Sequence, residues 1–491
     1  MVATADFILA LDQGTSGSAA LVFDRAAQRV GTADCEISLS YPQPGWVEAS
    51  PEDIFAATVQ MAEEALQLAG LDWPDVAAIG IANQRETTVV WERASGRPVG
   101  PAIIWQCRRT AELCAALRAA GHEELVRRRT GLTIDPYFSA TKIRWLLDRT
   151  PDGQRKAEAG ELLFGTVDTW LIWRLTGGRV HATDFTNASR TMLFDIHQGT
   201  WSPELLAMLD IPAAMLPEVR ASSGPFGETD RGTPILGVAG DQQAALFGQT
   251  CFAPGQCKST YGTGAFLLMN TGARPISSPA GLLTTLAAAP DTFALEGAVF
   301  TAGAAVQWLR DGLGIIARAE DTEALALSVL DTAGVVFVPA FVGLGSPHWD
   351  PTARGVIVGL TGGARREHLV RATLEAIGFQ VADLVEAMKR DSGFAVDSLR
   401  ADGGASANAF LMQFQADILD LPVECPAIQE TTALGAAYLA GLASGIWPSS
   451  DVLTGLQPQA LRYEPSMPVS RRDDLLATWR RAVDRAKAWA G

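Results

Sequence analysis

The sequence has no closely paired cysteines, no surplus of basic residues and no long apolar run. Its six cysteines are irregularly spaced and form no C-x-x-C motif, which argues against a zinc site or a disulfide framework. Lys and Arg number 39 against 55 Asp and Glu, and the net charge of −16 disfavours nucleic acid or an anionic membrane as a partner. No apolar run approaches the ~20 residues of a membrane span. Without a basic N-terminal signal segment, we expect a cytoplasmic protein with reduced thiols.

Two apolar runs each lead into an aspartate, one near the start of each half of the chain. Residues 7–11 precede Asp12, and residues 235–240 precede Asp241. A carboxylate at the carboxyl end of a buried strand lies where α/β sheets bind their ligands. A helix N-cap is the alternative role for such an aspartate, but the repetition favours a site. We therefore predict an α/β protein with one domain over 1–234 and another over 235–491.

A glycine-rich loop follows each of these elements. Residues 14–18 join the first strand to a second strand over 19–23, and residues 262–264 join strands over 258–261 and 265–269. Backbone amides and hydroxyls in such loops can hold phosphate. Neither loop carries the G-K-[ST] of a Walker motif. An ordinary polar hairpin turn explains the first loop equally well.

Polar and aromatic side chains follow two further apolar runs. Arg85 and Glu86 come after a predicted strand over 76–81, and Trp105 and Tyr137 follow later. Arg and Glu are rarely buried unless they are paired, so a surface salt bridge is the alternative interpretation. Charged groups bind hydroxyls by strong hydrogen bonds, and aromatic faces can cover C–H groups. This set suits a small polyol.

Several later segments carry structural predictions. Helices are expected over 51–69, 367–390 and 471–490, and buried strands over 335–339 and 356–360. The glycine pair 403–404 after a strand would let a flat ligand such as adenosine approach the backbone. The small-residue helix over 431–441 is expected to pack beneath that turn. Residues 183–191 read as a polar loop without an assigned role.

Longer stretches carry a more specific signal than any one loop. They include NQRETT at 83–88, WQCRRTAE at 105–112, GDQQAALFGQ at 240–249, YGTGAF at 261–266 and LMQFQADIL at 411–419. With these motifs the chain closely resembles the FGGY carbohydrate kinases, and among them the members that phosphorylate glycerol. The resemblance runs from Asp12 to about Trp489. It implies two RNase H-like α/β domains of the actin/hexokinase/heat-shock ATPase superfamily, with a ligand cleft between them.

The resemblance also implies the reaction, the cofactors and the site residues. The expected reaction is transfer of phosphate from ATP to glycerol, giving sn-glycerol 3-phosphate, with Mg²⁺ and with Asp241 as general base. The residues expected to bind glycerol are Arg85, Glu86, Trp105, Tyr137, Asp241, Gln242 and Phe266. Those expected to bind the nucleotide are Thr15, Ser16, Gly17, Thr263, Gly303, Gln307, Gly404 and Asn408. Asp12 and Asp241 would hold Mg²⁺ through water. Family members suggest a homodimer or homotetramer.

One position departs from the family pattern. Ala19 stands where most members of this type carry an arginine that contacts phosphate. Two alternatives therefore stay open: a kinase for another polyol such as erythritol, and a catalytically weakened nucleotide-binding homologue. The complete polyol-binding set argues against the first alternative. The presence of Asp12 and Asp241 argues against the second.

Overall fold

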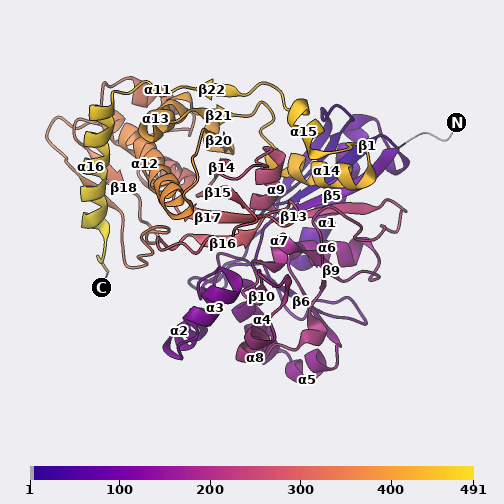
Figure 1. The fold of residues 1–491 in the computed structure, drawn as a ribbon. Coiled ribbons are helices and arrows are strands. Elements are labelled where there is room, and N and C mark those ends of the chain that lie inside the picture. The colour runs from indigo at the N-terminus through magenta and orange to yellow at the C-terminus, as the bar shows by residue number, and fades with distance from the viewer. Residues whose placement is uncertain (1–4, 491) are drawn as a thin grey trace. The chain divides into compact units, whose positions relative to one another are not determined.

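The computed structural model describes residues 5–490, which form two compact units. Unit 1 comprises the described residues up to Thr250, together with Thr284–Phe293 and Thr431–Leu456. Unit 2 comprises Cys251–Leu283, Ala294–Glu430 and the described residues from Gln457 onward. Figure 1 labels many of the elements of both units. The units differ from the predicted halves 1–234 and 235–491, because segments far along the chain pack within unit 1. Among residues 5–490, no helix has the length and apolar character of a membrane span.

A five-stranded sheet in the order β13-β5-β1-β2-β3 forms the centre of unit 1. Its strands are β1 (Phe7–Gln13), β2 (Gly17–Phe23), β3 (Arg29–Glu36), β5 (Val76–Asn83) and β13 (Ile235–Gly240). The predicted hairpin of β1 and β2 is confirmed. Strand β5 runs parallel to both β1 and β13. Asn83 is in register with Gln13 on one side and with Gly240 on the other, so three carboxyl ends meet at one edge.

Helix α14 (Thr431–Ser444) lies against this sheet and against α9 (Asp241–Gly248). Its alanines and glycines allow backbone to approach backbone. A Cβ at Gly80 of β5 would collide with the Ala436 carbonyl, and one at Gly435 would collide with the Ala244 carbonyl. The sequence analysis correctly expected this small-residue helix to pack closely. The prediction that it packs beneath the turn at 403–404 was wrong. The complementary glycines lie in β5 and α9, which no local pattern around 431–441 reveals.

The remaining elements of unit 1 surround this sheet. Helix α1 (Pro51–Ala69) matches its predicted bounds and packs on β2 and β3. The other helices are η1 (Trp73–Asp75), α2 (Ala111–Ala119), α3 (Glu123–Thr130), α4 (Ser139–Arg149), α5 (Gly153–Glu158), α6 (Val167–Leu175), α7 (Phe185–Ala188), α8 (Pro203–Leu209), η2 (Ala213–Met215) and α15 (Ser450–Leu456). The other strands are β4 (Glu48–Ala49), β6 (Val89–Glu92), β7 (Ala102–Ile103), β8 (Leu162–Gly165), β9 (Ala182–Asp184), β10 (Phe194–Asp195), β11 (Thr200–Trp201) and β12 (Glu218–Arg220).

The segment 183–191 is not the polar loop that the sequence suggested. It contains the end of β9 and all of α7, and its side chains are almost entirely buried. Asp184 caps α7 by accepting hydrogen bonds from the backbone amides of Thr186 and Asn187, both at 2.9 Å. Polar residues are buried here because they satisfy one another.

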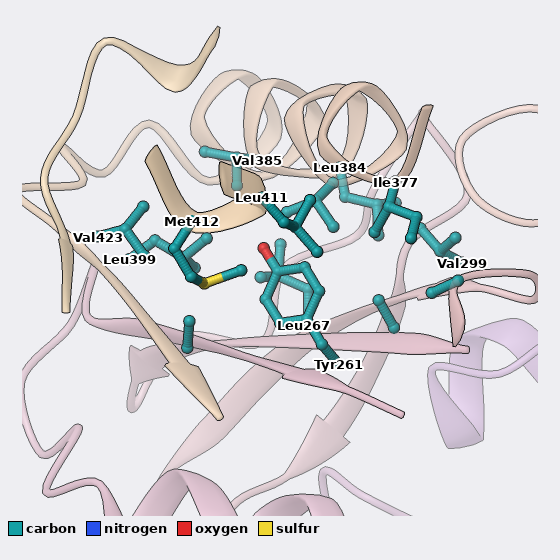
Figure 2. Packing of buried hydrophobic residues seen from close by; sticks show 14 of the residues in the cluster. Tyr261, Leu267, Val299, Ile377, Leu384, Val385, Leu399, Leu411, Met412 and Val423 are labelled. Atoms are coloured by element: carbon teal, nitrogen blue, oxygen red, sulfur yellow. The ribbon is translucent and has the colours of Figure 1, made fainter. Parts of the chain in front are cut away.

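Unit 2 repeats the arrangement of unit 1 around its own sheet. Within it, six strands follow the order β17-β15-β14-β20-β21-β22. Strands β14 (Cys257–Tyr261) and β15 (Ala265–Gly272) form the second predicted hairpin, and β20 (Leu399–Asp402) runs parallel to β14. Helices α12 (Arg366–Ser392) and α13 (Ala409–Leu419) cover this sheet, and Figure 2 shows Leu384 and Leu411 pointing toward Leu267 across the core. The buried Tyr261 hydroxyl donates to Gln415 Oε1 at 2.8 Å.

Shorter elements complete unit 2. They are β17 (Phe293–Val299), α10 (Gly303–Gln307), a π-helical turn (Trp308–Gly312), α11 (Asp321–Leu327), β18 (Val336–Val338), β19 (Val356–Val358), η4 (Gly404–Ala407), β21 (Val423–Cys425), β22 (Leu461–Tyr463) and α16 (Val469–Ala486). Strand β16 (Leu283–Leu286) includes the passage from unit 2 into unit 1. The predicted strand over 356–360 exists but is only half-buried.

Candidate functional site

The carboxyl ends of β1, β5 and β13 place three polar segments of unit 1 side by side. Residues 14–16 follow β1, residues 84–86 follow β5, and Asp241 follows β13. The Gln84 backbone amide donates to the Gln13 carbonyl at 2.7 Å, and Gln84 Nε2 donates to the Gly14 carbonyl at 3.0 Å. The parallel register thus joins residues that are more than 150 positions apart in sequence.

Arg85 stands at the centre of this edge, with its side chain only 2% exposed. Its Nε lies 3.3 Å from Asp241 Oδ1, and its Nη1 donates to Gln243 Oε1 at 3.2 Å. A Cβ at Gly240 would come within 2.7 Å of the Arg85 side chain, so the glycine leaves room for it. Asp241 itself is the first residue of α9, and its side chain is 28% exposed. The site therefore combines a buried cation with an accessible carboxylate.

Glu86 is buried beside Arg85, so the surface salt-bridge interpretation is wrong. Its backbone has φ of 62°, in the left-handed region that residues other than glycine rarely adopt. The hydroxyls of Thr88 and Ser139 both donate to the Glu86 carbonyl at 3.0 Å and hold this conformation. Such backbone strain costs about 1–3 kcal/mol and often occurs at functional sites. The Glu86 side chain accepts a hydrogen bond from Arg190 Nε at 2.6 Å.

Two aromatic residues stand next to the charged pair. Trp105 and Tyr137 meet edge to face, with ring centroids 5.4 Å apart. The Tyr137 hydroxyl accepts from Arg85 Nη2 at 3.4 Å. Trp105 Nε1 donates to Thr15 Oγ1 at 2.8 Å, which links the indole to the loop after β1. Unit 1 therefore contains the residues that the sequence proposed for the polyol, except Phe266, and Trp105 contacts Thr15, which it proposed for phosphate.

Asp12 lies at the end of β1, and its environment suits a cation. Burial, together with the nearby Asp241 carboxylate, raises the pKa of its carboxyl to about 7. A divalent cation would relieve this repulsion. No cluster of three or more His, Cys, Asp or Glu ligands occurs within residues 5–490. Two carboxylates without a full cage fit Mg²⁺, which keeps several waters and shares the phosphates of its substrate.

In unit 2 the turn between β14 and β15 supports the second phosphate-loop candidate. Thr263 is exposed at its tip. The Thr263 carbonyl accepts from the amides of Ala302 and Ala304, at 2.9 and 3.0 Å, which holds the turn against the start of α10. The Gly303 amide donates to the Gly262 carbonyl at 3.0 Å, and a Cβ at Gly303 would lie 2.6 Å from that oxygen.

Ser16 and Gly17, also proposed for the nucleotide, lie in unit 1, where Gly17 begins β2, whereas Gln307, Gly404 and Asn408 lie in unit 2. Gly403 has φ of 85°, and a Cβ there would press on the Tyr261 backbone at 2.7 Å. Gly404 is exposed and borders open space. Asn408 caps α13 by accepting from the Leu411 amide at 2.9 Å, a structural role that the sequence did not reveal. Gln307 is exposed at the end of α10, and Phe266 is half-buried on β15.

Sequence reasoning missed the residues that hold the site in place. Gln243 fixes Arg85 from one side, and its amide donates to Thr285 Oγ1 at 3.3 Å. Lys142 is fully buried and donates to the Tyr137 carbonyl at 2.7 Å. Burial lowers the pKa of Lys142 to about 7. Arg190 completes this group. The sequence did offer a sign of these three residues. Each is a polar side chain that stands in an apolar segment or in a segment to which no role was assigned.

Comparison with known proteins gives matches across both units. Residues 7–248 match the N-terminal domain of the FGGY family of carbohydrate kinases, and residues 257–444 match its C-terminal domain. The chain is 55% identical to glycerol kinase 2 of Thermotoga maritima, over 98% of the chain and 99% of that protein. It is 56% identical to a glycerol kinase of Symbiobacterium thermophilum, over 99% of each. The crystal structure of Plasmodium falciparum glycerol kinase with ADP superposes with a TM-score of 0.91 at 35% identity, covering 98% of both chains.

Proposed function

The chain belongs to the FGGY family of carbohydrate kinases, and we propose that it transfers a phosphate from ATP to glycerol with Asp241 as the general base. Glycerol kinase activity is supported by relatives about 55% identical over the whole length. The observation that carries the proposed mechanism is the position of Asp241. It is an accessible carboxylate within 3.3 Å of the buried Arg85, at the edge where three strands end.

The proposed chemistry is one in-line transfer. A terminal hydroxyl oxygen of glycerol attacks the γ-phosphorus of ATP, the bond to the β-phosphate oxygen breaks, and ADP leaves. The Asp241 carboxylate accepts the hydroxyl proton as the new bond forms. Because Asp241 would accept the proton while the new bond forms, a free alkoxide never has to form in water. The product is sn-glycerol 3-phosphate.

The same group of residues supports recognition of glycerol. Arg85 donates hydrogen bonds and Glu86 accepts them, so the two together match a hydroxyl, which does both. Tyr137 and Gln242 supply further polar contacts, and Trp105 and Phe266 would cover the carbon chain. The Trp105 indole is already held by Thr15 and Tyr137, so little ordering is needed when substrate binds.

We further propose roles for the remaining predicted residues. Asp12 and Asp241 would hold Mg²⁺ through water, and the ion would offset charge on the transferring phosphoryl group. The contacts with the nucleotide would come from Thr15, Ser16, Gly17, Thr263, Gly303, Gln307, Gly404 and Asn408. The ADP-bound relative supports a nucleotide as partner. The free state of all six cysteines supports a reducing compartment such as the cytoplasm. Assembly as a homodimer or homotetramer stays a prediction.

An ADP-release assay over a panel of polyols tests the proposed function. With Mg-ATP, glycerol should give the highest kcat/KM, and erythritol should be a poor substrate. Preference for erythritol would favour the alternative kinase. No turnover with any polyol, together with retained ATP binding by calorimetry, would favour the weakened nucleotide-binding homologue.

The charged pair Arg85 and Glu86 predicts strictness for both terminal hydroxyls of glycerol. A hydrogen bond to a charged group contributes ~1.5–3 kcal/mol, and ~1.4 kcal/mol is a factor of ten. We therefore expect 1,2-propanediol, which lacks one terminal hydroxyl, to lose at least roughly tenfold in kcat/KM relative to glycerol. Steady-state kinetics with both substrates at saturating ATP measures this ratio. Equal kcat/KM values would contradict the proposed contacts.

Because Ala19 replaces the expected arginine, we predict that the protein binds ATP weakly. In the sheet it pairs with Asp12 on β1 and with Asp34 on β3, so all three side chains share one face. An arginine at 19 would place a cation next to Asp12 and near the loop after β1. We expect Ala19→Arg to lower the KM for ATP or raise kcat, because a guanidinium offsets charge on the transferring phosphoryl group. The KM for glycerol should stay nearly constant.

Ala19→Gln serves as the matched control, since it adds length without charge. If Ala19→Arg folds normally and leaves both parameters unchanged, or lowers activity, then Ala19 is not a deficit in this chain.

A further inference from the structure

The buried segment 183–191 is tied to the polyol-binding edge at several points within unit 1. The Gly240 amide, one residue before Asp241, donates to Thr186 Oγ1 at 2.8 Å. Thr186 in turn donates to Asp184 at 2.7 Å. The side-chain amides of Asn187 and Asn83 donate to each other at 3.0 and 2.9 Å. The segment is therefore fixed to the ends of both β13 and β5.

Arg190 is the last charged residue of this segment and is fully buried. Its Nε lies 2.6 Å from Glu86 Oε1, whereas Arg85 Nε is 3.9 Å from the same oxygen. The Arg190 guanidinium also lies 5.6 Å from the ring of Tyr137 and 5.3 Å from that of Phe138, over their faces. One side chain thus contacts two of the residues proposed to bind glycerol.

Arg190 is better suited than Lys142, the other nearby basic residue, to pair permanently with the Glu86 carboxylate. Lys142 also faces Glu86, but burial lowers its pKa to about 7, so its charge varies at neutral pH. A guanidinium stays charged under all ordinary conditions. A carboxylate has about four acceptor positions, so the bond from Arg190 leaves capacity for a substrate hydroxyl.

We propose that Arg190 is a positioning residue of the polyol site: it holds the buried Glu86 carboxylate oriented as a hydroxyl acceptor and fixes the face of the Tyr137 ring. Arg190 acts through these two residues, which its guanidinium contacts directly. The inference rests on the proposed function and assigns a role to the segment that sequence reasoning left without one.

The test is the KM for glycerol in Arg190→Gln. We expect it to rise at least tenfold, while the KM for ATP changes less than about threefold and kcat falls less than the KM rises. A general loss of structure would change both KM values or reduce the active fraction without this split. Arg190→Lys keeps the charge and loses the planar group, and it should recover part of the affinity.

A double-mutant cycle with Glu86 shows whether Arg190 affects glycerol binding through Glu86 or independently of it. In the Glu86→Gln background, Arg190→Gln should raise the KM for glycerol by less than about threefold, because the partner it orients is already gone. The double variant removes both charges of the Arg190–Glu86 pair together, so it keeps the test available if the single variant folds poorly. An equal rise in both backgrounds would overturn the proposal.

Arg109→Gln is the matched control in the same unit. The side chain of Arg109 is fully buried and pairs with Glu48 at 2.7 Å. Its loss should lower thermal stability without the split between the two KM values.

A wild-type protein without glycerol turnover would refute the proposed function. An active wild type whose Arg190→Gln variant keeps its KM for glycerol would refute this inference alone.

Discussion

Replacing Asp241 with asparagine should reduce kcat by roughly 10²-fold or more, the range typical for loss of a general base. Asparagine keeps the size and shape of the side chain but accepts protons poorly. The KM for glycerol should change less than kcat, because Arg85, Glu86 and Tyr137 still hold the hydroxyls. Steady-state kinetics at saturating ATP and glycerol measures both parameters.

Asp195→Asn is the control for this experiment. Asp195 is also ion-paired in unit 1, with Arg129 at 3.1 Å, but it lies outside the proposed site. Its loss should leave kcat close to that of the wild type. Near-normal turnover in purified, folded Asp241→Asn would show that another group accepts the proton.

The largest expected effect on stability comes from Gly435→Ala in α14. A Cβ there would collide with the Ala244 carbonyl in α9, and backbone cannot move aside as a flexible side chain can. The two helices must separate, and such overpacking costs about 3 kcal/mol at the upper end of the usual range. For a unit of this size we expect the melting temperature to fall by roughly 6–12 °C. Thermal denaturation followed by circular dichroism measures the shift.

Activity should fall together with stability in this variant, because α9 begins at Asp241 and its displacement moves the proposed base. Gly455→Ala provides the comparison. Gly455 lies in α15 of the same unit, and a Cβ there meets nothing within 4 Å. Alanine is the better helix former by up to ~1 kcal/mol, so this variant should be as stable as the wild type or slightly more stable. Similar melting temperatures for the two variants would contradict close packing of α14 on α9.

Local pattern was enough to predict the elements that carry the site. The apolar runs before Asp12 and Asp241 are strands β1 and β13, and the two glycine-rich segments are hairpin turns. These features depend on neighbouring residues: the apolar content of a short run, followed by residues that favour turns or helix starts. The motifs shared with the FGGY kinases identified the family for the same reason, since each motif is a continuous stretch of chain.

Burial and partnership, in contrast, were decided by the tertiary structure. From the sequence, a surface salt bridge was the alternative interpretation of Arg85 and Glu86, and residues 183–191 were predicted to form a polar loop. Both are buried because β5 lies between β1 and β13, which brings the end of β5 against segments 70 or more residues away. The place of α14 follows from glycines in β5 and α9, about 190 to 360 positions earlier. The sequence determines which side chains are able to pack or pair. The register of strands that are distant in sequence determines which of these side chains come into contact.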